Sequence, residues 1–250
     1  MSCLRARLVA QGFSLGSPCH RIATKSEGAS APEVNVQATP NVRLILASAS
    51  PRRRELLAQA GYAFSVEAAD VDESVRAGET PEAYVRRLAE EKATAVFTKH
   101  TGAPSSAASS SRVGSNEAPL LVLGADTTVV LDNEILAKPN DAAHAKRILL
   151  RLSGRVHQVL TGVAVATRAG VASAVETTEV TFSAIPASEL DLYCATPEPL
   201  DKAGAYGIQG YAARWIPRID GDYFNVMGLP IARVVRLLED ASEEPRGRSV

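Results

Sequence analysis

The chain has 250 residues, of which 46% are hydrophobic and 22% charged, and its formal net charge is −1. This length and composition suit one large or two small globular domains with a substantial core. The near-neutral charge argues against a nucleic-acid partner, and the lack of an apolar run of roughly 20 residues argues against a membrane-spanning protein. Three cysteines, in neither a metal-ligand nor an even disulfide pattern, indicate a reducing compartment such as the cytoplasm.

Residues 1–42 differ in composition from the rest of the chain. There is no acidic residue from Met1 to Ser26, and residues 26–40 are rich in Ser, Ala and Pro. This extension is compatible with a mitochondrial or plastid transit peptide, with a disordered tail or with a misassigned start codon. We expect a domain over residues 43–240, with a low-complexity insertion at 101–119 and a C-terminal tail at 241–250.

The first predicted strand and helix form the most informative local pattern. Leu44–Ala47 is a short apolar run that predicts a buried strand, and Ser50 followed by Pro51 predicts the start of a helix. The arginines at 52–54 then fall in the first turn, where the helix dipole makes each cation cost about 0.3–1 kcal/mol. A solvated basic helix is the plainer interpretation. The combination of strand, cap and arginines favours a phosphate site at the free backbone N–H groups.

Further along the chain, predicted helices and strands are mixed. In the first half we expect a helix over 52–60, a strand over 62–66, a helix over 80–99, a strand over 120–123 and a hairpin of segments 128–131 and 134–136 with its turn at 132–133. In the second half we expect a helix over 140–152, strands over 156–166 and 171–182, a helix over 187–195, a hairpin at 220–222 and a last helix from 230. Crossovers and hairpins together predict an α/β domain on a mixed β-sheet flanked by helices. No dinucleotide-binding or P-loop motif is present.

Carboxylates occur at two informative places. Asp126 follows the predicted buried strand 120–123, and strand ends are where ligands bind in α/β sheets. Asp72 and Glu73 lie in a loop and offer the hard oxygen ligands that Mg²⁺ prefers. Asp126 could instead cap a turn, and an acidic loop is often only solvated.

Basic and amide side chains complete this set. Lys92 lies within a helix, Lys138 follows a strand, and Lys202 and Gln209 lie in the glycine-rich segment 201–210, where a backbone can approach a ligand closely. Each could be an ordinary surface residue, and Lys92 could be an ion-paired one. Taken together, these groups predict a polyphosphate clamp with carboxylates for a metal and a water, as phosphoryl or nucleotidyl transfer requires. The remaining candidate, His157 at a strand start, we interpret as a structural histidine.

Seven motifs carry a family resemblance. They are Ser48–Arg53, Asp70–Glu73, Gly124–Thr127, Leu136–Pro139, Leu152–His157, Asp201–Gly210 and Gly228–Pro230. In this order they resemble the Maf-like nucleoside triphosphate pyrophosphatases, from about residue 43 to the last helix. The resemblance implies an elongated α/β domain with a substrate cleft, similar to inosine triphosphatases and usually homodimeric. It implies hydrolysis of a nucleoside triphosphate to the monophosphate and pyrophosphate with a divalent metal, Mg²⁺ or Mn²⁺.

The resemblance also suggests a role for each candidate residue. Asp126 would accept the proton of the attacking water and, with Asp72, would bind the metal. The triphosphate would be held by Ser48, Ser50, Arg52, Arg53, Lys92, Lys138 and Lys202. Arg52, Thr127 and Gln209 match the subtype that acts on dTTP and UTP, with Thr127 and Gln209 reading the pyrimidine.

Two alternative functions stay open at this point. One is a pyrophosphatase for other nucleotides, such as 7-methyl-GTP. The other is a non-catalytic nucleotide-binding regulator of cell division. Asp72 stands where glutamate is also common in the family, and its shorter reach makes the metal geometry less certain.

Overall fold

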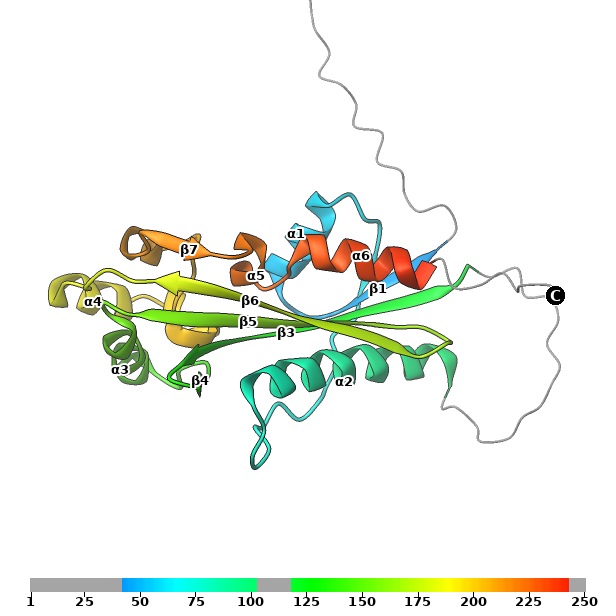
Figure 1. Ribbon diagram of the computed structural model, residues 1–250, viewed down its shortest axis with the longest axis horizontal. Helices are drawn as coiled ribbons and strands as arrows, with labels where there is room; N and C mark the ends of the chain where they lie inside the picture. The colour runs from blue at the N-terminus through cyan, green and yellow to red at the C-terminus, as the bar shows by residue number, and fades with distance from the viewer. Residues whose placement is uncertain (1–41, 103–117, 243–250) are drawn as a thin grey trace, which may run out of the picture. The chain divides into compact units, whose positions relative to one another are not determined.

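The computed structural model describes residues 42–102 and 118–242 (Figure 1). The predicted N-terminal extension up to residue 41, most of the predicted insertion (103–117) and the tail from 243 lie outside the described residues, as do Cys3 and Cys19. Within the described ranges, no helix combines the length and apolar character needed to cross a membrane.

Helices and strands are mixed along the described chain. The strands are β1 (Arg43–Ala47), β2 (Ser65–Val66), β3 (Leu120–Leu131), β4 (Glu134–Leu136), β5 (Val156–Ala166), β6 (Val171–Thr181) and β7 (Arg218–Asp220). The α-helices are α1 (Pro51–Gln59), α2 (Pro81–Thr101), α3 (Ala142–Leu152), α4 (Ala187–Cys194), α5 (Tyr223–Met227) and α6 (Ile231–Ser242). Short 3₁₀ helices are η1 (Glu198–Asp201), η2 (Ala203–Ala205) and η3 (Tyr211–Trp215).

The strands of the described chain form one seven-stranded sheet in the order β2-β1-β3-β5-β6-β7, with β4 paired to β3. β1 runs parallel to both of its neighbours, β2 and β3. From β3 onward, the pairs β3–β5, β5–β6 and β6–β7 are antiparallel. The predicted α/β class with a mixed, helix-flanked sheet is therefore confirmed.

Helices cover both faces of this sheet (Figure 1). Successive strand residues point to opposite faces, so Leu44 and Leu46 pack with buried residues of α1 and α6, whereas Ile45 packs with α2. A third cluster, which includes Phe182 and Trp215, joins the other halves of β3, β5 and β6 to α3 and α4. Residues of the long strands β3 and β5 therefore belong to core clusters at both ends of these strands.

β3 is longer than the sequence predicts. We expected one strand over 120–123 and a separate hairpin segment over 128–131, but both are parts of a single strand that runs from Leu120 to Leu131. The reason is its partner: β5 pairs with β3 from Val122 to Val130, so ladder hydrogen bonds carry the strand through Gly124. Asp126 therefore lies inside a strand rather than after one.

The predicted hairpin at 220–222 is also wrong. β7 ends at Asp220, and Asp222 caps α5 by accepting hydrogen bonds from the backbone N–H groups of Phe224 (2.7 Å) and Asn225 (3.3 Å). Gly221 has φ 123°, a conformation that glycine adopts readily, and it turns the chain from the strand into the helix.

Candidate active site

One edge of β3 is interrupted where Asp126 lies. On this edge β1 pairs with β3 as far as Gly124, and β4 begins to pair at Val129. Within the described chain, residues 125–128 therefore have no strand partner on this side. A cleft of about 820 Å³ lies here, lined by the start of α1, the centre of β3 and segments 198–210 and 226–228.

Two glycines let α2 lie very close to the sheet. A Cβ atom on Gly124 of β3 or on Gly162 of β5 would overlap backbone carbonyl oxygens of α2. Because neither residue has a side chain, the helix backbone rests directly on the two strands. This close approach places Lys92 of α2 beside Asp126.

Lys92 links two carboxylates at the cleft. Its Nζ lies 2.7 Å from Oδ1 of Asp126 and 2.5 Å from Oε1 of Glu73. Lys92 and Asp126 are each only 8% exposed, whereas the Glu73 side chain is about half exposed. Burial raises the pKa of Glu73, but the hydrogen bond to Lys92 and nearby positive charges outweigh this effect and hold the pKa below its usual value. Glu73 is therefore an ionised carboxylate at neutral pH.

Asp126 and Glu73 are the groups that could hold a metal ion. Carboxylate oxygens are hard ligands, and Mg²⁺ is typically bound through one or two carboxylates plus substrate phosphates and water. Across residues 42–102 and 118–242, no group of three or more His, Cys, Asp or Glu side chains is placed to hold a metal ion. Any divalent ion at these two carboxylates would therefore need further ligands from a phosphorylated molecule or from water.

Asp72, the metal ligand that we expected, is not brought into the cleft. Its Oδ1 accepts a hydrogen bond from the backbone N–H of Ser74 (2.9 Å), and its Oδ2 accepts one from the Ser74 hydroxyl (2.9 Å). These hydrogen bonds lower the pKa of Asp72 and close a local turn. The turn leaves Asp72 exposed and lets the next residue, Glu73, reach Lys92.

Every other predicted site residue lines the cleft. At the start of α1, Ser50 is the N-cap, and its Oγ accepts a hydrogen bond from the backbone N–H of Arg53 (3.4 Å). The Oγ of Ser48 accepts one from the backbone N–H of Ser50 (3.2 Å). Arg52 borders the cleft, while Arg54 is exposed and does not line it. The predicted phosphate site therefore opens onto the same cleft as Asp126.

Arg53 is held by protein groups. Its Nε donates to the carbonyl oxygen of Gly228 (2.8 Å), and its Nη2 donates to Oγ1 of Thr127 (2.9 Å). Nη1 donates to the carbonyl oxygen of Ala125 (2.9 Å) and to Oγ of Ser48 (3.3 Å). Burial lowers the pKa of Arg53. Because a guanidinium has five N–H donors, only one is left for the phosphate contact that we expected.

Thr127 is engaged in the same hydrogen-bond chain. Its hydroxyl accepts from Arg53 and lies 3.0 Å from Oγ1 of Thr161, which itself donates to the carbonyl oxygen of Asn225 (3.0 Å). The Thr127 hydroxyl has two acceptors in reach for its own hydrogen, Oγ1 of Thr161 and the carbonyl oxygen of Gly228 (3.4 Å). Contact of Thr127 with a pyrimidine, as the sequence suggested, would use its methyl group or a remaining lone pair.

The other wall of the cleft carries the remaining polar candidates. Nζ of Lys202 donates to the carbonyl oxygen of Glu198 (2.7 Å) and to Oδ1 of Asp201 (2.5 Å). Lys138 and Gln209 are exposed at the cleft, where both can reach a bound molecule.

His157 lies on β5, is buried and does not line the cleft. Its Nε2 lies 2.7 Å from the hydroxyl of Tyr206, and its ring makes edge contacts with Phe182 and Tyr206. Burial lowers the pKa of His157 to about 4. The structural interpretation of this histidine is confirmed.

The family model described as "Maf-like protein" matches residues 43–241. The chain belongs to the Maf-like family. A dTTP/UTP pyrophosphatase of Myxococcus xanthus is 50% identical over 79% of this chain and 92% of the relative. One of Vibrio cholerae is 47% identical over 78% of this chain and 96% of the relative. The solved Staphylococcus aureus Ham1 protein aligns with TM-score 0.38 and 15% identity, over 70% of this chain and 79% of that one.

The matched Maf-like region contains the whole cleft, from the start of α1 to segment 226–228. The cleft carboxylate that the predicted metal site leaves out is Glu73. The sequence offers Asp72 and Glu73 together as oxygen ligands, and the expected metal site takes only Asp72. The local sequence does not show which of Asp72 and Glu73 enters the cleft, because this depends on contacts of Glu73 with Tyr84 and Lys92 of α2.

Proposed function

We propose that this Maf-like protein hydrolyses dTTP and UTP to the monophosphate and pyrophosphate, and so removes nucleotides from the cellular pool. The observation that carries the proposal is the buried Asp126–Lys92 pair, with Glu73 beside it, in a cleft bordered by a helix N-terminus and basic side chains. The names of the relatives from Myxococcus xanthus and Vibrio cholerae supply the substrate class. They favour dTTP and UTP over 7-methyl-GTP.

The triphosphate would bind where free donors and positive charge converge. The first turn of α1 presents the positive end of its dipole and the backbone N–H of Arg52, because Pro51 has no N–H and the N–H groups of Arg53 and Arg54 are bonded to Ser50. Arg52, Lys138 and Lys202 border the same space and offset the negative charge of the phosphates. Arg53 supports this site mainly by fixing α1 to β3 and to the loop at Gly228.

Asp126 is suited to the proton transfer. In the hydrolysis, the oxygen of a water forms a bond to the α-phosphorus, the bond from that phosphorus to the bridging oxygen breaks, and pyrophosphate leaves. The proton of the attacking water passes to the carboxylate of Asp126, acting as general base. Lys92 fixes the orientation of this carboxylate, and the basic side chains stabilise the charge on the departing pyrophosphate.

Asp126 and Glu73 are the residues that would hold a divalent cation, Mg²⁺ or Mn²⁺. When bound, such an ion neutralises phosphate charge and lowers the pKa of a coordinated water. Gln209 at the cleft would read the pyrimidine edge with its amide donor and acceptor. We further propose a homodimer in the cytoplasm, as the family resemblance and the cysteine usage suggest.

The test is release of pyrophosphate from dTTP and UTP by the Asp126→Asn variant. We expect kcat to fall by about 10²–10⁴-fold, the usual contribution of a general base. The matched control is Asp132→Asn in the exposed β3–β4 turn, where asparagine tolerates the φ of 52°.

Pyrophosphate release by Asp126→Asn at a near-wild-type rate would contradict the role of Asp126. Stoichiometric binding of dTTP by the wild-type protein without any pyrophosphate formed would favour the regulator instead. Faster release from 7-methyl-GTP than from dTTP or UTP would overturn the substrate class.

A further inference from the structure

We propose that Arg87 of α2 is a positioning residue for Glu73: its ion pair with Glu79 and its hydrogen bond to Ser74 hold the loop 68–80 so that the Glu73 carboxylate lies in the cleft. The proposal rests on the proposed function, because it takes Glu73 to be part of the catalytic apparatus. It goes beyond that function by assigning a role to a residue outside the cleft.

The loop that carries Glu73 has little backbone structure of its own. It connects β2 to α2 without a helix or strand, and in the described structure it contains one backbone–backbone hydrogen bond, from the N–H of Glu79 to the carbonyl oxygen of Arg76 (3.0 Å). The Glu73 side chain is also half exposed, so packing does not fix it. Its position must therefore be set by side chains of neighbouring elements.

Arg87 supplies the main set of these contacts. Its Nε and Nη2 donate to the two carboxylate oxygens of Glu79 at 2.6 and 2.8 Å, and Nη2 also donates to the carbonyl oxygen of Ser74 (3.0 Å). The fork geometry of a guanidinium fits a carboxylate at two points, which fixes orientation as well as distance. The contacts therefore fasten the loop at two places on its path between Glu73 and α2.

We call the contacts of Arg87 with Glu79 and Ser74 the clamp, and its ion pair is largely shielded from water. The side chains of Arg87 and Glu79 are 12% and 8% exposed, whereas that of Arg76, an arginine of the loop, is 63% exposed. The hydrogen bond from Arg87 lowers the pKa of Glu79 to about 2, so the pair stays charged under all ordinary conditions. An ion pair of this kind is much less weakened by salt than an exposed one.

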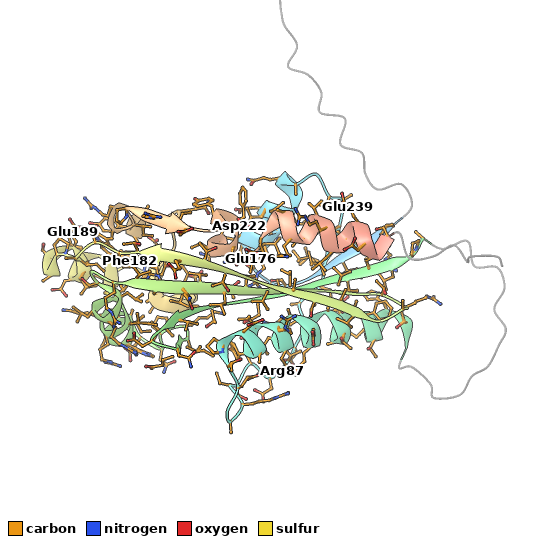
Figure 2. The ribbon with its side chains drawn as sticks, viewed as in Figure 1. Arg87, Glu176, Phe182, Glu189, Asp222 and Glu239 are labelled. Atoms are coloured by element: carbon orange, nitrogen blue, oxygen red, sulfur yellow. The ribbon has the colours of Figure 1, made fainter. Side chains whose placement is uncertain are left out.

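The same helix, α2, carries both the arginine of the clamp and the lysine of the cleft. Figure 2 shows Arg87 on the side of α2 that faces away from the sheet, next to the loop. Tyr84, one turn earlier, donates its hydroxyl to the carbonyl oxygen of Glu73 (3.0 Å), and Lys92 of the same helix contacts the Glu73 carboxylate. The helix thus fixes both the loop and the lysine that Glu73 must meet.

The first experiment compares Arg87→Gln with Arg86→Gln. Arg86 precedes it on α2 but contacts Glu82 and Ser173 instead of the loop, so its replacement removes a similar charge without touching Glu73. We expect Arg87→Gln to lower kcat for dTTP by about 10–100-fold, as loss of a supporting contact commonly does. KM should change little, because the basic groups of the cleft stay in place. Arg86→Gln should keep the wild-type kcat.

A double-mutant cycle separates positioning from a general effect on folding. If Arg87 acts through Glu73, Arg87→Gln should add almost no further loss of kcat in a Glu73→Gln background. Amide hydrogen exchange of residues 73–79 in the nucleotide-free protein should also rise in Arg87→Gln and stay at the wild-type rate in Arg86→Gln. Arg87→Lys, which keeps the charge but not the fork, should lie between the wild type and Arg87→Gln.

Additive losses in the cycle, or a wild-type kcat in Arg87→Gln, would overturn the positioning role. These outcomes are distinct from failure of the proposed function. That failure would appear in the wild-type protein, as a lack of pyrophosphate release from dTTP and UTP.

Discussion

Glu73 and Asp72 are adjacent carboxylates with different partners. Glu73 contacts Lys92 in the cleft, whereas both oxygens of Asp72 accept hydrogen bonds from Ser74. We expect Glu73→Gln to lower kcat for pyrophosphate release by about 10–100-fold, because the amide is a neutral and much weaker partner for a cation. Asp72→Asn should change kcat by less than about threefold, since an asparagine keeps the acceptor for the Ser74 N–H.

Steady-state kinetics with dTTP at saturating Mg²⁺ compare the two variants directly. Melting temperatures close to that of the wild type would show that both variants fold. A large loss of kcat in Asp72→Asn with little loss in Glu73→Gln would return the metal-binding role to Asp72.

Arg52 and Arg53 are adjacent in sequence, but their side chains lie in different environments. Arg53 donates four hydrogen bonds, to Ser48 just after β1, to two groups on β3 and to the loop at Gly228, whose carbonyl oxygen lies 175 residues away in sequence. Arg52 has no hydrogen-bond partner within the described residues, and it borders the cleft. In sequence the two are a uniform basic run, so only the fold separates a residue that fixes the site from one free to contact phosphate.

At the scale of elements, the close contact of α2 with β3 and β5 holds the site together. We expect Gly162→Ala to destabilise the protein by about 1–3 kcal/mol, because its Cβ would overlap backbone atoms of α2 that cannot turn aside as a side chain can. It should also lower kcat, since the helix that carries Lys92 must shift from Asp126. Urea unfolding and dTTP hydrolysis measure the two effects.

The control for this change is Gln158→Ala, at an exposed position of the same strand. It should leave both the free energy of unfolding and kcat close to the wild-type values. Unchanged stability and kcat in Gly162→Ala would show that α2 is not held by this contact.

Local patterns predict elements well where a cap or a turn sets them. The Ser50–Pro51 cap gave the right start for α1, and the turn at Asp132–Asn133 adopts the positive φ values that such hairpins need. The continuation of β3 through residues 124–127 was missed because it depends on pairing with β5, which comes some thirty residues later. β2 is shorter than predicted because only Ser65 and Val66 pair with β1.

For the molecule as a whole, the sequence order of the motifs was enough to predict the fold class and most of the cleft. All of the predicted site residues except Asp72 line one cavity, although they come from segments spread over 160 residues. What the motifs could not reveal is the orientation of each side chain, because Arg53, Thr127 and Glu73 are aimed by partners distant in sequence.

The buried His157 makes the stability of the whole domain depend on pH. Burial lowers its pKa in the folded protein to about 4, against 6.5 for an ordinary histidine. Between these values the unfolded chain binds a proton that the folded protein does not, so the free energy of unfolding falls as the pH falls from about 6.5 to about 4. One such proton corresponds to about 1.4 kcal/mol for each pH unit, or about 2 kcal/mol from pH 7 to pH 5.

His157→Gln should remove this contribution, because glutamine does not titrate and can still hydrogen-bond the hydroxyl of Tyr206. Urea unfolding at pH 7 and pH 5 is the measurement, and the loss of stability on acidification should be smaller in the variant by about 2 kcal/mol. Gln158→Ala, at the exposed neighbouring position of the same strand, serves as the control and should follow the wild-type curve. An identical pH dependence in His157→Gln and the wild type would mean that His157 is not held neutral by the fold. In that case the acid sensitivity of the domain would come from other groups.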